Sequence, residues 1–145
     1  RCNNHYFFRE ADGILIVCNV NDPRSLANVE DWRNDVYRAK GISSKEKFPC
    51  LCVANKSDIV SPTKMTDADL TAWRKSTGIP YFKVSAYEAD SFRAIDDAFT
   101  FLINSVLELE DERKMAKEKI DRENERKAQQ LEMEKAYARR QAGRK

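Results

Sequence analysis

Continuous apolar runs divide this chain into blocks, and the first block is the most informative. Residues 14–20 are almost entirely apolar, which is the pattern of a parallel strand buried on both faces. Shorter runs at residues 51–54 and 81–84 predict two further strands. Long segments separate and follow these strands, and their apolar residues recur with a different period. These segments are long enough to form helices.

Apolar residues in those segments recur at helical spacing, and polar residues and glycines mark where each helix starts and stops. We predict a first helix capped by Ser25 and ending near Gly41, a second opened by the capping box Thr66-x-x-Asp69 and closed by Gly78, and a third starting at Ser91. Strands that alternate with helices indicate right-handed crossovers. The predicted fold class is therefore α/β with a parallel sheet.

The composition changes after about residue 109, where charged side chains dominate. Glutamates precede lysine or arginine by four residues at Glu110–Lys114, Glu118–Arg122 and Glu123–Lys127, an order that favours a helix. The last helix is therefore expected to continue beyond the globular part. We divide the chain into a domain at residues 1–109 and a charged extension, helical or disordered, at residues 110–145.

The extension carries few apolar residues. A heptad continued from Leu102 and Leu109 places Ala116 and Glu123 in the seam, so the heptad pattern does not support a stable coiled coil. Two alternatives stay open for this segment. It is either a solvated extension or a helix that binds an effector or adaptor protein.

Charge and hydropathy exclude several classes of protein. Lys and Arg total 26 against 24 for Asp and Glu, so net charge gives no case for a nucleic-acid partner. No apolar run approaches the roughly 18 residues of a membrane span, and no signal-peptide pattern is present. No cysteine follows Cys52, so nothing indicates a C-terminal lipid anchor. A cytoplasmic location is the expectation.

The four cysteines and the single histidine do not indicate a metal site. Cys18, Cys50 and Cys52 lie in predicted strands, and the spacing Cys50-x-Cys52 differs from the C-x₂-C of zinc sites. Buried, reduced core cysteines are the expected state, which suits the cytosol. Cys2 and His5 lie near the start of the chain, and His5 alone cannot build a histidine metal site.

Candidate chemistry follows the second strand, in the loop Asn55-Lys56-Ser57-Asp58. An asparagine offers both donors and acceptors, whereas a carboxylate only accepts. Asn55 and Asp58 together can match a guanine edge, which presents acceptors N7 and O6 and donors N1–H and N2–H₂. Adenine would leave the carboxylate unpaired, and polar sites reject near-isosteres in that way. The next strand ends in Ser85-Ala86, where a backbone N–H can donate to O6.

Several segments in order resemble the Ras superfamily of small GTPases, and the Rab branch most closely. Asn55-Lys56-Ser57-Asp58 matches the guanine-specificity motif of that family, and Ser85-Ala86 matches its second guanine loop. The other similar segments are residues 7–13, which resemble Y-Y-R-G-A-x-G, residues 21–32, which resemble T-D-x-x-S-F-x-N-V-x-x-W, and residues 78–82, which resemble G-I-P-F/Y. The resemblance covers roughly residues 5–107.

This resemblance implies a P-loop-NTPase-type fold with three of its six strands present, and a GTP/GDP switch in intracellular membrane trafficking. It also implies roles for six residues at a guanine nucleotide. Asn55 would bridge N7 and O6 and tie the loops together, Lys56 would lie along the base and ribose, and Asp58 would accept from N1–H and N2–H₂. In the second loop, Ser85 would brace the backbone and the Ala86 N–H would donate to O6. Tyr87 would stand where the family usually has a lysine. No catalytic residue is assigned.

The phosphate-binding motifs of the family are missing from the sequence. No glycine is followed by Lys-Ser or Lys-Thr, so there is no G-x-x-x-x-G-K-[ST] loop, and no D-x-x-G is present. The ligands for the Mg²⁺ of an intact domain are therefore not in this chain. We expect a fragment holding the carboxyl-terminal half of a GTPase domain. The alternatives are a nucleotide-free pseudo-GTPase adaptor that binds partners through its last helix, and an unrelated α/β module with a coincidental loop.

Overall fold

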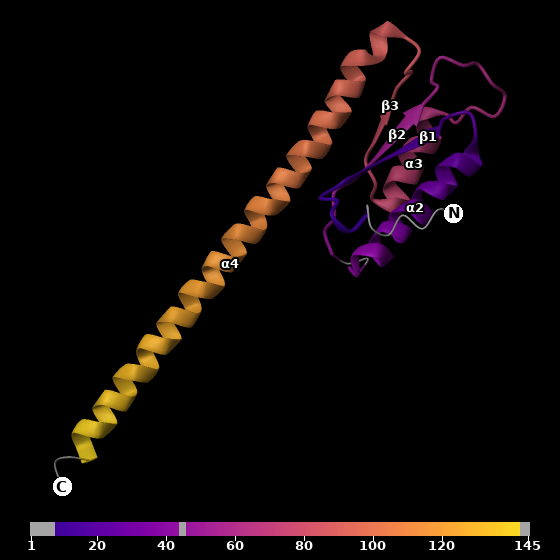
Figure 1. Ribbon diagram of the computed structural model, residues 1–145. Coiled ribbons are helices and arrows are strands. Elements are labelled where there is room, and N and C mark those ends of the chain that lie inside the picture. Colours follow the sequence, from indigo (N-terminus) through magenta and orange to yellow (C-terminus); the bar gives the residue numbers. More distant parts are fainter. Residues whose placement is uncertain (1–7, 44–45, 143–145) are drawn as a thin grey trace. The chain divides into compact units, whose positions relative to one another are not determined.

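The computed structural model describes residues 8–43 and 46–142 of the chain (Figure 1). They fall into two compact units, Arg1–Leu109 and Glu110–Lys145. The first unit contains the sheet and the helices that pack on it, and the described part of the second is a single charged helical segment. Cys2 and His5 lie outside the described residues.

Among the described residues of the first unit, three parallel strands form the sheet, as the sequence predicted. They are β1 (Ile14–Asn19), β2 (Cys50–Asn55) and β3 (Tyr81–Lys83), in the order β1-β2-β3. Ile14 pairs with Cys50 and Asn19 with Asn55, while Ala54 pairs with Lys83. The first two strands therefore begin and end together, and the polar loops after β2 and β3 emerge at one edge.

After β1, the described residues contain the three predicted helices in order: α2 (Pro23–Lys40), α3 (Asp67–Thr77) and α4 (Phe92–Ala142). A 3₁₀ turn, η1 (Ala89–Ser91), precedes α4. Gly41 and Gly78 close α2 and α3 with φ of 67° and 70°, a left-handed conformation that glycine adopts without steric cost. The capping box of Thr66 and Asp69 is confirmed. Each side chain bonds to the backbone N–H of the other residue, which satisfies two donors at the start of α3.

Two predicted helix starts were wrong. Asp22, not Ser25, caps α2, because its carboxylate accepts from the Arg24 N–H and Pro23 pre-sets the first helical φ. The Ser25 hydroxyl instead accepts from the Asn19 N–H at 2.9 Å. Ser91 ends the 3₁₀ turn and α4 starts one residue later. The Ser91 hydroxyl accepts a hydrogen bond from the Ser85 N–H at 3.1 Å.

Two apolar clusters cover the two faces of the sheet. One lies between the sheet and α2 and α3, with Val20, Val29 and Leu70 fully buried. In the other, Leu51 of β2 and Val84, which follows β3, pack against the first turns of α4. Cys18 and Cys52 are buried free thiols in the first cluster and Cys50 is a half-buried free thiol, as expected of core cysteines.

Within the described residues β1 has one neighbouring strand, so its other edge carries no strand. Val17 on this strand is 59% exposed. An apolar cavity of about 390 Å³ lies alongside, lined by Phe8, Ile14, Leu15, Ile16, Val17, Trp32 and Val36. An exposed apolar strand edge of this kind is an aggregation hazard.

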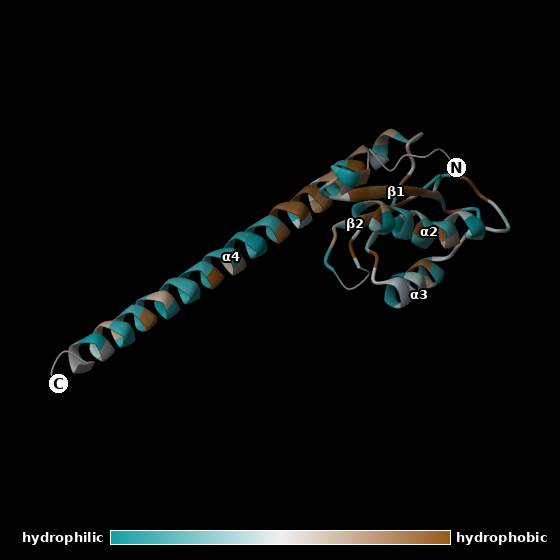
Figure 2. Cartoon of the chain, turned by 60° about the horizontal axis from the view of Figure 1, so that its bottom comes forward, coloured by the Kyte–Doolittle hydropathy of each residue, from teal (hydrophilic) through white to brown (hydrophobic). Residues whose placement is uncertain are grey.

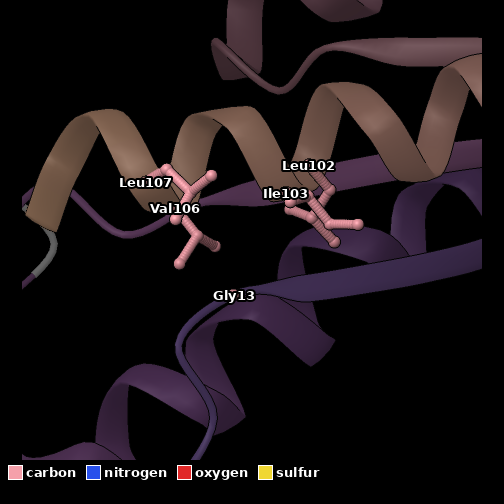
Figure 3. A pocket seen from close by; sticks show the side chains of 5 residues that line it. All are labelled: Gly13, Leu102, Ile103, Val106 and Leu107. Carbon is pink, nitrogen blue, oxygen red and sulfur yellow. The ribbon is translucent and has the colours of Figure 1, made fainter.

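Gly13 lets the first unit's part of α4 approach the start of β1 closely (Figure 3). A Cβ atom at this position would lie 3.0 Å from Val106 Cγ2, 3.2 Å from Pro49 Cβ and 3.3 Å from Leu102 Cδ1. A cavity of about 220 Å³ at this contact is lined by Gly13, Leu102, Ile103, Val106 and Leu107. The position therefore requires glycine for space rather than for a special φ.

In the second unit α4 continues to Ala142, which agrees with the long charged C-terminal helix in the predicted fold. Figure 2 shows it as mostly hydrophilic with isolated hydrophobic residues. In the described part of the chain, no helix has an apolar stretch long enough to cross a bilayer.

Candidate functional site

The candidate site is formed by the loops that follow β2 and β3. Ala54 and Lys83 are register partners in these parallel neighbours, so both loops leave the sheet at its carboxyl edge. Ligands of open α/β sheets bind at that edge. The Ser57 N–H donates to the Val84 carbonyl at 3.1 Å, which extends the contact between the two segments beyond the strands.

Asn55 joins the two loops through its side chain. Its Oδ1 accepts from the Lys56 N–H at 2.7 Å and from the Ala86 N–H at 2.9 Å. The Ala86 N–H is the group that the family resemblance assigns to guanine O6. In this structure it donates to Asn55, so a base oxygen would have to share or replace that hydrogen bond.

Ser85 lies fully buried beneath the site and organises it. Its hydroxyl donates to Asp58 Oδ1 at 2.6 Å and accepts from the Tyr87 and Glu88 N–H groups, each at 3.2 Å. Hydrogen bonds to a carboxylate are among the stronger ones in proteins. One oxygen of Asp58 is therefore held in place, and its turn is tied to the turn after β3.

Two residues that the sequence did not single out hold the Asn55–Asp58 loop from below. Asn21 donates from Nδ2 to the Lys56 carbonyl at 2.8 Å, and Lys64 donates from Nζ to the Ser57 carbonyl at 2.5 Å. Lys56 has φ of 66°, a left-handed conformation that non-glycine residues seldom adopt. The hydrogen bond from Asn21 fixes the peptide unit that follows it. Hydrogen bonds of this kind join segments that are distant in the sequence, and no local sequence pattern marks them.

A cavity of about 400 Å³ lies over this constellation, lined by Asn55, Lys56, Asp58, Ile59, Ala86 and Tyr87. The structure thus gathers five of the six predicted site residues around one cavity and places Ser85 behind them. Ile59 is a lining residue that sequence reasoning missed. Tyr87 is 90% exposed at the rim, where a flat ring can lie over a planar ligand.

The site has no feature of a metal centre. Among the residues that the structure describes, no three His, Cys, Asp or Glu side chains gather as they would around a metal ion. The arrangement can supply a fixed carboxylate acceptor, an amide, a cation and an aromatic surface. It suits recognition of a planar group that presents neighbouring N–H donors.

The family model described as the Ras family matches residues 2–108. The chain belongs to the Ras family. It is similar to a GTP-binding protein yptV5 of Volvox carteri, 33% identical over 111 residues, which are 75% of this chain and 53% of that protein. It is also similar to the Ras-related protein Rab-9A of Homo sapiens, 31% identical over 106 residues, 72% of this chain and 51% of the relative.

This Ras-family chain is a Rab-like small GTPase by its relatives, which include a Ras-related protein Rab7 of Prunus armeniaca, 33% identical over 109 residues, 73% of this chain and 51% of that protein. The chain spans about half the length of the curated relatives it matches. The match excludes an unrelated α/β module with a coincidental loop, and it does not favour the nucleotide-free adaptor.

Proposed function

We propose that this Rab-like GTPase reads the guanine base of GTP or GDP with the loops after β2 and β3. The hydrogen bond from Ser85 to Asp58 Oδ1 is the observation that carries the proposal. It holds a carboxylate at the wall of a cavity large enough for a base, with Tyr87 and Lys56 beside it.

Base selection follows from the chemistry of that carboxylate. Guanine offers N1–H and N2–H₂ on one edge, and a carboxylate can accept from both. Adenine has an acceptor at N1 and no amine at C2, so Asp58 would lose its water without gaining a partner. Leaving a charged group unpaired costs more than the hydrogen bond itself contributes. Asn55 and the Ala86 N–H would meet the N7 and O6 edge.

The whole protein is proposed to act as a GTP/GDP switch in intracellular membrane trafficking, working from the cytoplasm through effector proteins. The family membership supports this role. Magnesium, when bound, would neutralise phosphate charge during hydrolysis. The residues described here are fitted to the base alone, and none of them is assigned to phosphate or metal.

Nucleoside monophosphates test the base site without relying on phosphate affinity. We expect millimolar GMP to shift the backbone amide NMR signals of Lys56, Asp58 and Ala86 in the complete 145-residue chain, and AMP to leave them unchanged. Asp58→Asn should abolish the response to GMP and create one to XMP, because xanthine has a carbonyl where guanine has its N2 amine. Glu88→Gln is the matched control, since it removes a nearby carboxylate outside the cavity.

Two results would overturn the proposal. One is an equal response to GMP and AMP in the unmodified chain, and the other is a GMP response that survives Asp58→Asn. Either would remove Asp58 as the group that reads the base.

A further inference from the structure

The charged helix carries an internal repeat of eleven residues. Residues 109–141 form three consecutive segments, each of which begins with an aliphatic residue followed by an acidic one and has glutamate in fourth place. The first-position residues are Leu109, Ile120 and Leu131, and the fourth-position residues are Glu112, Glu123 and Glu134. Eleven residues make three helical turns, so equivalent positions form a nearly straight stripe. A heptad continued from Leu109 drifts away from this stripe.

The stripe is aliphatic, half-buried at Leu109 but exposed at Ile120 and Leu131, and charges of opposite sign flank it. Ile120 is 57% exposed and Leu131 is 51% exposed. With about 3.67 residues per turn, the fourth position lies about 65° to one side of the stripe and the ninth about 65° to the other. The fourth position is always glutamate. The ninth is Lys117, Ala128 and Arg139 in the three segments.

We propose that the helix of the second unit pairs with the same helix of a second copy, parallel and in register, as a two-stranded coiled coil with an eleven-residue repeat. Flanking charges set orientation in coiled coils. A parallel pair places each glutamate flank against the opposite flank of its partner. Glu134 then faces the partner's Arg139, and Glu112 faces the partner's Lys117. An antiparallel pair would bring the two glutamate flanks together.

Polar residues near the stripe agree with the same arrangement. The fifth and eighth positions lie about 33° to either side of the stripe, so in a parallel pair the fifth faces the partner's eighth. Asn124 then faces the partner's Lys127, whose ammonium can donate to the amide oxygen. Polar residues in a seam fix register at a cost in stability. We therefore expect one register and a weak dimer, whose population rises with the concentration of the chain.

Two ion pairs within the helix lie away from this surface, whereas Lys135 of a third pair, 3.0 Å from Glu132, lies beside the stripe. Lys114 pairs with Asp111 at 3.7 Å and Arg122 with Glu118 at 3.6 Å, on the side opposite the stripe. Such pairs support an isolated helix. Association therefore does not need to break the Lys114–Asp111 and Arg122–Glu118 pairs. The proposed pairing does not involve the nucleotide site.

Sedimentation equilibrium of the complete chain tests the seam. We expect a reversible dimer that the double variant Ile120→Gln/Leu131→Gln weakens by about a hundredfold or more, because four aliphatic side chains leave the interface. The matched control is Met115→Gln/Met133→Gln. These methionines are 62% and 67% exposed on the same helix but lie off the stripe. The control should change the dimer constant by less than about threefold, and circular dichroism should show equal helix content in both variants.

Charge reversal tests the orientation. Glu134→Lys or Arg139→Glu alone should weaken the dimer about tenfold, since each makes two like-charge contacts. An equimolar mixture of the two variants should regain the original dimer constant, because opposite charges then meet at both contacts. A chain that stays monomeric at all concentrations overturns the proposal. So does a dimer that Glu134→Lys strengthens, because that result shows an antiparallel pair.

Discussion

The hydroxyl of Ser85 donates a hydrogen bond of 2.6 Å to Oδ1 of Asp58, across 27 residues of chain. This contact links the loop after β2 to the loop after β3 from inside the protein. Ser85 is fully buried and also serves the Tyr87 and Glu88 N–H groups. One hydroxyl therefore supports both halves of the candidate site.

Ser85→Ala should lower the free energy of unfolding by about 1–3 kcal/mol, because it leaves a carboxylate oxygen and two N–H groups without their partner. Urea unfolding followed by circular dichroism measures the change. Ser76→Ala is the control, since the Ser76 hydroxyl is exposed and donates only to the Trp73 carbonyl. A loss no larger than that of the control would show that water replaces the Ser85 contacts without cost.

The chain as it stands should bind GTP more weakly than micromolar, even with magnesium. Micromolar affinity needs about 8.2 kcal/mol of net binding energy. Charge-assisted hydrogen bonds contribute about 1.5–3 kcal/mol each, and association itself has an entropic cost. Isothermal titration calorimetry measures the affinity. A micromolar or tighter constant would require a phosphate site outside the loops that follow β2 and β3.

Gly13→Ala should destabilise the first unit by about 1–3 kcal/mol, the usual cost of overfilling a packed contact. The added methyl carbon would lie 3.0 Å from Val106 Cγ2 and 3.2 Å from Pro49 Cβ. The midpoint of urea unfolding reports the change. Val106→Ala in the same chain should recover part of the loss by making room, and an additive double variant would contradict this steric explanation.

Deleting residues 112–145 should leave the melting temperature of the first unit unchanged within a few degrees. Every removed side chain that the structure describes is exposed, and most of them are charged. Exposed ion pairs contribute about 0–1 kcal/mol each. Differential scanning calorimetry measures the transition. The deletion should also abolish the dimer proposed above. A fall in melting temperature of more than a few degrees would show that the helix stabilises the globular unit.

Burial raises the pKa of the Cys50 thiol to about 11, from an ordinary value near 9. Alkylation requires the thiolate. At pH 8 the thiolate fraction is then about a hundredfold lower than for an ordinary thiol, and alkylation should slow by at least that factor. Iodoacetamide labelling of a Cys2→Ser chain, read by peptide mass spectrometry, measures the rate. The same chain in urea is the control, and equal rates in both states would show that Cys50 is accessible and unperturbed.

The order of elements, the parallel sheet and most of the candidate site could be predicted from the sequence. Residues 14–20 are apolar except for Asn19, and such a run is typical of a parallel strand, although Val17 on it is 59% exposed. Thr66 and Asp69 marked a helix start because capping is a contact within four residues. The loop Asn55–Asp58 could be recognised because its residue types suit a guanine edge.

Only the tertiary structure decided which polar groups hold the site together. Asn21 and Lys64 brace the Asn55–Asp58 loop from other segments, and no local pattern marks contacts of this kind. The prediction that Ser25 caps α2 failed for a related reason. Asp22 competes for the same helix start, and Ser25 is drawn instead to the Asn19 N–H at the end of β1. Local spacing determines where elements form, whereas hydrogen bonds between distant segments depend on how those elements pack.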